Sequence, residues 1–148
     1  MANTKAFQKI LSFREREKNE AQIAYKQSVE SFEDVATQLY NLLRKKEDVE
    51  NKYNYYLETM GSVTNIATHY SYIERIKEKI TRLETSVNEA RHVMDAKQLK
   101  LTNAHIETKK YEKLIERKKL KLKEHELEQE NKLMDETSII QFLNNRDR

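Results

Sequence analysis

The stretch at residues 58–65, ETMGSVTN, contains Gly61, the only glycine of a 148-residue chain that has no proline. Gly61 can adopt the left-handed conformation that ends a helix, and the hydroxyl of Ser62 can cap the helix that follows. Tight turns need such residues, and the rest of the chain offers no comparable place to reverse. We therefore expect two helices that run antiparallel, because so short a connection brings the second back alongside the first.

The composition agrees with long helices rather than with a globular core. Charged and apolar residues are almost equally frequent, at 36% and 37%, and mean hydropathy is −0.97, so little of the chain can be buried. Strong helix formers such as Lys, Glu and Leu dominate. The absence of cysteine excludes disulfides and thiolate chemistry. No apolar run has the length of a signal peptide or a membrane span, and we expect a soluble, cytoplasmic protein.

Apolar residues recur every seven positions on both sides of the turn, with companions three positions further on, which is the pattern of a coiled coil. We call these positions the seam. Before the turn the seam consists of Leu11, Lys18, Tyr25, Phe32, Leu39, Lys46, Tyr53 and Met60, with companions Arg14, Ala21, Ser28, Val35, Leu42, Val49 and Tyr56. After the turn it consists of Ile66, Ile73, Ile80, Val87, Met94, Leu101, Thr108, Ile115 and Leu122, with companions Ile76, Leu83, Ala90, Lys97, Ala104 and Tyr111.

The seam predicts an all-α fold, a long antiparallel two-helix coiled-coil hairpin that forms one domain over residues 1–148. The expected parts are helix one at about 5–60, a turn at 61–62, helix two at about 63–132 and a C-terminal tail at about 133–148. This register places Phe32 opposite Ala90 and Tyr53 opposite roughly Tyr70. Helix two is the longer arm, and beyond about Lys118 it has no partner within the hairpin, so its apolar positions need another surface or remain exposed.

The projecting arm has a strong charge pattern. Residues 109–123 hold eight basic and two acidic residues, whereas residues 124–136 hold six acidic and one basic residue. The basic block can dock onto an acidic or phosphate-bearing surface, or the two blocks can be a solvated helix. The tail carries a cluster of apolar residues, which either contact a partner or fold against the arm: Ile139, Ile140, Phe142 and Leu143.

The sequence offers no catalytic, metal or cofactor site. His69, His92, His105 and His125 are never three or four positions apart, so no two share a helical face as a zinc site requires. A two-helix hairpin also lacks the concavity that a small-molecule substrate needs. We expect no enzymatic activity, no cofactor and no nucleic acid, because Tyr111 is the only aromatic residue within the basic block.

Tyrosines gather near the turn, where a thin hairpin cannot bury them fully. They are Tyr53, Tyr55, Tyr56, Tyr70 and Tyr72. Tyrosine supplies contact area at low entropic cost, so this cluster is a candidate binding surface. The alternative is that the rings only thicken the seam.

Four stretches in this order and spacing resemble the FliJ family of flagellar type III export proteins over nearly the full chain. They are FQKILSFRERE at 7–17, ESFEDVATQLYNLL at 30–43, ETMGSVTNIATHYSYIERI at 58–76 and MDETSIIQFL at 134–143. The resemblance implies a non-enzymatic, cytoplasmic component of the export apparatus for bacterial flagellum biogenesis and motility. It also implies a fold similar to the coiled coil of the rotary ATPase shaft subunit.

The resemblance further implies three partners. The terminal end is expected to engage the hexameric export ATPase and promote its assembly or activity, and the hairpin tip to engage the cytoplasmic domain of the export gate membrane protein. Export chaperones are the third partner. Peripheral recruitment to the flagellar base, at the inner face of the cell membrane, is expected to occur only through these partners.

Carried over by position, the expected contacts fall at both ends of the hairpin. At the tip the gate contact corresponds to Gln38, Leu42, Tyr70, Tyr72 and Ile76. At the terminal end the ATPase contact draws on Phe7, Leu11, Arg14, Lys18, Tyr111, Arg117, Lys118, Lys119 and Lys121. Two other functions stay open from the residues alone: a coiled-coil scaffold that associates with itself through the long arm, and a basic hairpin that binds nucleic acid.

Overall fold

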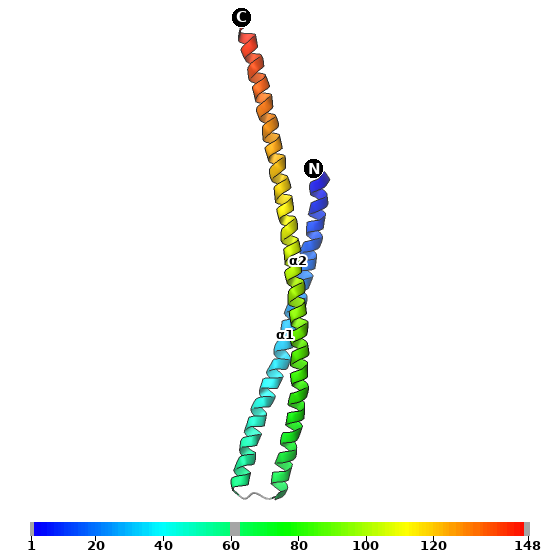
Figure 1. Ribbon diagram of the computed structural model, residues 1–148, viewed down its shortest axis with the longest axis vertical. Helices are drawn as coiled ribbons and strands as arrows, with labels where there is room; N and C mark the ends of the chain where they lie inside the picture. The colour runs from blue at the N-terminus through cyan, green and yellow to red at the C-terminus, as the bar shows by residue number, and fades with distance from the viewer. Residues whose placement is uncertain (1, 60–62, 147–148) are drawn as a thin grey trace. The chain divides into compact units, whose positions relative to one another are not determined.

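The structure, a computed structural model, describes residues 2–59 and 63–146. These residues form two helices, α1 from Ala2 to Glu58 and α2 from Val63 to Arg146, which pack against each other (Figure 1). No strand occurs in these two ranges. The all-α, two-helix hairpin predicted from the sequence is therefore confirmed. Within the same ranges, no helical segment combines the length and the apolar content that a bilayer span requires.

The chain leaves α1 through a turn at Thr59. The backbone N–H of Thr59 donates a hydrogen bond to the carbonyl of Tyr55 at 3.0 Å, and its hydroxyl donates to the same oxygen at 2.8 Å. This doubly bonded carbonyl marks the last turn of α1. The expected helix end at Gly61, the cap at Ser62 and the seam position Met60 lie outside the described residues.

The helices contribute to two compact units. The hairpin unit contains residues 19–102, and the terminal unit contains α1 up to Lys18 together with α2 from Asn103. Each unit is described by itself below. The expectation that the chain forms one domain stays a prediction.

The hairpin unit buries a narrow stripe from both helices. Ala21 and Ser28 of α1 are buried, as are Ile73, Ile76 and Ile80 of α2. The three isoleucines are spaced by three and four positions, so they lie on one face of the helix. Burying such a side chain removes it from water and contributes about 1.5–3 kcal/mol, which makes this isoleucine row the main apolar contact near the turn.

Contacts that aromatic rings make between α1 and α2 show the relative direction of the two helices in the hairpin unit. Arg91 lies over the ring of Phe32 with its Cζ 5.8 Å from the ring centre, and the rings of Tyr56 and His69 are 4.9 Å apart. As residue numbers fall along α1, they rise along α2, which is the antiparallel arrangement. The predicted pairing of Phe32 with the neighbourhood of Ala90 is confirmed.

The terminal unit continues the same pattern. Thr108 and Ile115 of α2 are buried, and the ammonium of Lys118 lies 4.2 Å from the centre of the Phe7 ring. Beyond Lys118 no residue up to Arg146 is buried or half-buried. Figure 1 shows the red end of α2 continuing past the blue N-terminal part of α1. The prediction that the arm has no partner beyond about Lys118 is confirmed.

Heptad spacing identified the buried stripe almost completely. Among the described residues, every seam position named above is buried or half-buried except Leu122, which is 39% exposed. Leu122 differs because it follows Lys118, where α1 no longer covers α2. The polar members Lys18, Lys46 and Lys97 are half-buried, which agrees with aliphatic stems that cover the seam while the ammonium groups reach water.

Helix α2 continues to Arg146, past the end expected near Lys132. No glycine or proline follows Gly61, and Lys, Glu and Leu are the most frequent residues between 119 and 146, so nothing in this segment stops a helix. The apolar cluster of the expected tail lies on this helix, and its four side chains are 50–67% exposed. Local folding of the cluster against the arm, one of the two sequence alternatives, is not observed.

Replacing Ile73 with alanine should lower the free energy of unfolding by about 2 kcal/mol. This value is near the lower end of the range for truncation of a buried isoleucine, because an open two-helix seam can relax around the cavity. Ile73 is 5% exposed, whereas Ile139 is 59% exposed. The matched change Ile139→Ala should cost less than about 0.5 kcal/mol. Urea unfolding followed by circular dichroism measures both values, and equal losses would contradict the position of Ile73 in the seam.

Ending the chain after Lys118 should leave the unfolding of the remaining hairpin almost unchanged, within about 0.5 kcal/mol, because the removed residues bury nothing against α1. The helical signal per molecule should fall in proportion to the residues removed. A chain that ends after Thr102 serves as the contrast, since it also loses Thr108 and Ile115 and should unfold more easily. Thermal unfolding of the three chains tests this. A large loss on removal of the arm alone would show that the arm packs against the hairpin.

Candidate functional site

The terminal unit is organised around Arg14 of α1. One guanidinium nitrogen of Arg14 donates to the carboxylate of Glu17 at 3.1 Å, and its Cζ lies 5.7 Å from the centre of the Tyr111 ring on α2. A second aromatic ring, that of Phe13, lies 6.0 Å from the same atom. Planar guanidinium groups stack on aromatic faces in this way, and each contact contributes about 0.5–1 kcal/mol near a surface. The pair Arg14–Tyr111 thus joins two residues predicted for the ATPase contact.

The surroundings of Arg14 keep it charged. Partial burial works against the charged form, but hydrogen bonds to Glu17 and Tyr111 and the negative charges of Glu17 and Glu107 outweigh it, so the pKa of Arg14 is raised above its ordinary value. An arginine is cationic at any physiological pH even without this effect. The positive charge of the terminal seam is therefore permanent.

Thr108 is the residue of this unit that sequence reasoning did not recognise as special. Its side chain is 1% exposed, and its hydroxyl lies 2.9 Å from the carbonyl of Ala104 and 3.2 Å from the carbonyl of Arg14 on the other helix. The single hydroxyl hydrogen can serve either oxygen. Heptad spacing placed Thr108 in the seam, but spacing alone does not show that a small hydroxyl brings the two backbones this close.

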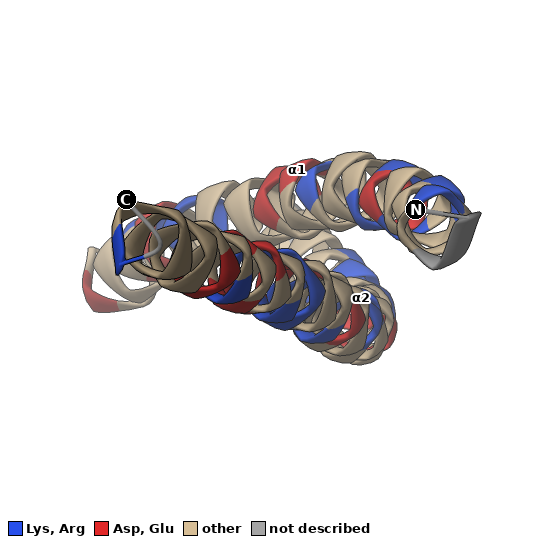
Figure 2. Ribbon diagram, turned by 90° about the horizontal axis from the view of Figure 1, so that it is seen from above, with Lys and Arg blue, Asp and Glu red and all other residues tan. Residues whose placement is uncertain are grey.

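Some of the remaining residues of the expected ATPase contact are half-buried between the helices, and the others are exposed. Phe7, Leu11 and Lys18 are half-buried, and the stacking of Lys118 on Phe7 joins the two helices. Arg117, Lys119 and Lys121 are exposed and project from α2. Figure 2 shows basic residues in blue followed by acidic residues in red along α2 toward its C-terminus. The terminal unit therefore presents a row of free cations beside an aromatic seam.

The tip of the hairpin unit is aromatic. The ring of Tyr56 lies 6.1 Å from that of Tyr55 and 4.9 Å from that of His69 on α2. Tyr53 and Tyr56 are half-buried, as expected for seam positions. Tyr55, Tyr70 and Tyr72 are 63%, 55% and 37% exposed, respectively. The tyrosine cluster thus includes both rings that thicken the seam and rings that are available to a partner.

The residues predicted for the gate contact differ in exposure. Tyr70 and Gln38 are exposed, and the amide of Gln38 donates to Asp34 at 3.3 Å along its own helix. Leu42 is half-buried. Ile76 is 3% exposed and belongs to the buried isoleucine row, so its side chain positions the helix and does not present a surface.

Tyr72 has a neighbour on the opposite helix that the sequence did not reveal. The ammonium of Lys45 lies 5.5 Å from the centre of the Tyr72 ring. This contact joins the exposed sides of α1 and α2, three positions after Leu42 on α1. A partner that binds Tyr72 would therefore also meet a positive charge.

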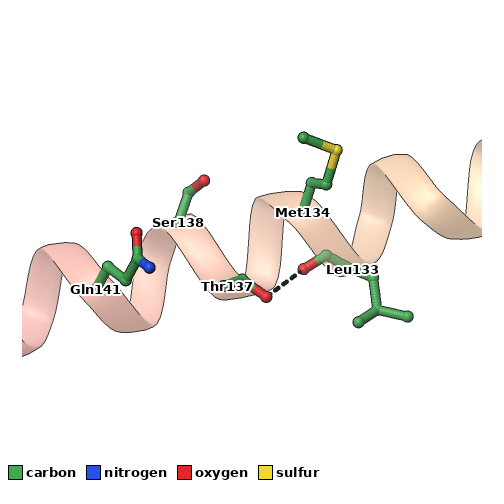
Figure 3. Close-up of a pocket in the computed structure, with 5 residues that line it drawn as sticks. All are labelled: Leu133, Met134, Thr137, Ser138 and Gln141. Atoms are coloured by element: carbon green, nitrogen blue, oxygen red, sulfur yellow. Dashed lines mark hydrogen bonds between the residues drawn. The ribbon is translucent and has the colours of Figure 1, made fainter.

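Two open hollows on the described surface bear on the candidate sites. The first, of about 220 Å³, lies in the hairpin unit and is lined by Glu50, Tyr53, Asn54, Tyr70, Ile73, Glu74 and Lys77. Tyr53 and Tyr70 both line this hollow, which agrees with the predicted register at the tip. The second is formed by α2 alone, and Figure 3 shows Met134 and Ser138 on one side of the helix and Leu133 on the other. A surface of one helix cannot enclose a small molecule.

Residues 2–59 and 63–146 contain no group of three or more His, Cys, Asp or Glu side chains placed to hold a metal ion. The described residues do present an exposed row of basic side chains in the terminal unit and exposed tyrosines in the hairpin unit.

Comparison with known proteins assigns the chain to a family. The family model described as "Flagellar FliJ protein" matches residues 4–147. A relative from Bacillus subtilis (strain 168), named "Flagellar FliJ protein", is 34% identical over 143 residues, which is 97% of each chain. No solved structure gives a significant match. Because both matches extend over the two helices and both candidate surfaces, the chain belongs to the flagellar FliJ protein family.

Proposed function

We propose that this chain is a non-enzymatic adaptor that engages the hexameric export ATPase with its terminal unit and the export gate with its tip. As a member of the FliJ family it is a component of flagellar export. The family match over residues 4–147 is the observation that carries the proposal. The two chemically different surfaces support it, since a connector between two partners needs a distinct surface for each.

Exposed cations next to a covered aromatic seam favour the terminal unit as the ATPase contact. Arg117, Lys119 and Lys121 are exposed and have no recorded ion pair among the described residues. Free cations that meet an acidic partner raise the rate of association and fix its orientation. Arg14–Tyr111 and Lys118–Phe7 hold the two helices together directly beside them. The mechanism we propose is that this basic end inserts into the ATPase ring and promotes its assembly or turnover.

Reversing two of these charges, with Lys119→Glu and Lys121→Glu in one chain, should raise the concentration needed for half-maximal ATPase stimulation by about tenfold, because like charges would face an acidic partner. Steady-state ATP turnover of the purified export ATPase measures the effect. The matched control, Lys79→Glu with Lys100→Glu, makes the same change in net charge at exposed positions of the hairpin unit. If both variants lost ATPase stimulation equally, the effect would depend only on net charge. That result would contradict a basic docking surface at the terminal end.

The exposed tyrosines favour the tip as the export gate contact. Tyr70 and Tyr72 lie on α2 close to the turn, and Lys45 of α1 adds a positive charge over the Tyr72 ring. Aromatic and cationic side chains of this kind contribute much of the affinity at protein interfaces. We propose Gln38, Leu42, Tyr70 and Tyr72 as the contacting side chains, with buried Ile76 as their support. Export chaperones and recruitment to the inner face of the cell membrane through these partners complete the proposal.

The combined change Leu42→Ala and Tyr72→Ala should weaken binding to the cytoplasmic domain of the gate protein by about tenfold, since truncating an aromatic anchor costs one to two kcal/mol. ATPase stimulation should stay unchanged, because both residues lie in the hairpin unit. Calorimetric titration of the gate domain measures the affinity. Ile23→Ala is the control, as Ile23 is 59% exposed on α1 but lies outside the tip. Loss of both activities together would indicate unfolding and contradict a local contact.

A further inference from the structure

Two heptapeptides on the arm of α2 are mirror images in charge. In residues 117–123, RKKLKLK, the central Leu120 has a basic residue one and three positions away on both sides. In residues 124–130, EHELEQE, the central Leu127 has an acidic residue at the same four offsets. From this arrangement we infer that the arm pairs antiparallel with the arm of a second copy of this chain. The inference does not rest on the proposed function, although both use Lys119 and Lys121.

Both leucines are free to make such a contact. Leu120 is 57% and Leu127 is 58% exposed, and every residue from Lys119 to Arg146 is exposed. They are seven positions apart and therefore lie on one face of α2. Met134 continues this spacing toward the C-terminus and is 68% exposed, whereas the position seven residues before Leu120 is Lys113. A second apolar stripe thus runs along the arm.

The second stripe does not compete with the seam. The seam positions of this segment are Ile115 and Leu122, and Leu120 lies on the opposite side of the helix from them and from Lys118. A second copy can therefore cover Leu120 and Leu127 while Lys118 stays on Phe7. Pairing requires no opening of the hairpin.

Several like charges lie one helical turn apart on the arm. Like charges occur four positions apart at Arg117 and Lys121, at Lys119 and Lys123, at Glu124 and Glu128, and at Glu126 and Glu130. Each such pair destabilises an isolated helix by a few tenths of a kcal/mol. The structure records no ion pair for any of these eight side chains within the described part of α2. A partner with the opposite charge pattern would relieve this repulsion.

An antiparallel second copy provides that pattern. When Leu120 of one copy faces Leu127 of the other, Arg117 faces Glu130, Lys119 faces Glu128, Lys121 faces Glu126 and Lys123 faces Glu124. The two-fold symmetry repeats these four pairs, so sixteen charged side chains of the two arms meet opposite charges, while Lys118 faces the uncharged Gln129. A parallel pair in register would instead place like charges against each other, and a parallel pair shifted by seven positions would not close. Charge complementarity therefore selects a second copy in the antiparallel orientation.

Self-association would also hide part of the basic block. Lys119 and Lys121 would face acidic residues of the other copy and would no longer be free for another acidic partner. Pairing of two arms and docking of the basic block elsewhere are then mutually exclusive.

Charge-block variants of the full chain test the inference. Variant one carries Arg117→Glu, Lys119→Glu, Lys121→Glu and Lys123→Glu, and variant two carries Glu124→Lys, Glu126→Lys, Glu128→Lys and Glu130→Lys. Each alone should be monomeric, because its arms repel, whereas an equal mixture should form heterodimers at a concentration at least about tenfold lower than either alone. Sedimentation equilibrium of each sample and of the mixture measures this.

A chain with all eight changes exchanges the two blocks and should dimerise as the original chain does, with the same weakening by salt. This variant separates loss of pairing from loss of folding, since its composition of charges is the original one. An original chain that stays monomeric at every concentration, or single-block variants that dimerise as it does, would overturn the inference.

The orientation can be tested by cross-linking, because the chain has no cysteine of its own. Antiparallel pairing predicts that Leu120→Cys and Leu127→Cys variants form a disulfide with each other when mixed, and that neither forms one by itself. Disulfides within each variant, and none between them, would show parallel pairing and contradict the inference.

Discussion

The structure depends on one constraint: in a chain with a single glycine and no proline, the stretch around Gly61 is the most favourable place to reverse direction. Two helices give one line of contact, and a helix that has one neighbour buries only a stripe of its surface. All buried residues of the described chain lie on that stripe. The stripe therefore holds the side chains that folding removes from water, among them the isoleucines of the hairpin unit and the closely packed Thr108 of the terminal unit.

The fold could be predicted from the sequence because the constraint and the periodicity are both local. A seven-residue repeat needs no knowledge of distant residues, and it located Ile73, Ile80 and Thr108 correctly. The C-terminal limit of α2 could not be predicted as well, since periodicity fades where no partner helix covers the arm. In this segment the intrinsic helix propensity of the residues determines the structure. The helix therefore continues to Arg146.

The candidate surfaces could be predicted only in part. Positions that correspond to family contacts can be read from the sequence, but their exposure depends on how each helix is rotated. Tyr72 remains accessible, whereas Ile76, four positions later, is turned into the seam. Contacts such as Lys45 with Tyr72 and Lys118 with Phe7 depend on side-chain rotamers of two helices at once. No pattern within one helix can indicate them.

The two surfaces and the self-pairing arm follow from the same geometry. A residue that the seam does not bury is available to solvent, so a chain with a narrow seam has many exposed positions. Exposed apolar groups and neighbouring like charges are unfavourable at these positions until another surface covers them. Near the tip, exposed tyrosines are partly covered by neighbours such as Lys45. Along the arm, Leu120, Leu127 and all residues from Lys119 to Arg146 are exposed. The strongest drive for association therefore lies in the arm, where two opposite charge patterns lie end to end on one helix and a single symmetry operation matches both.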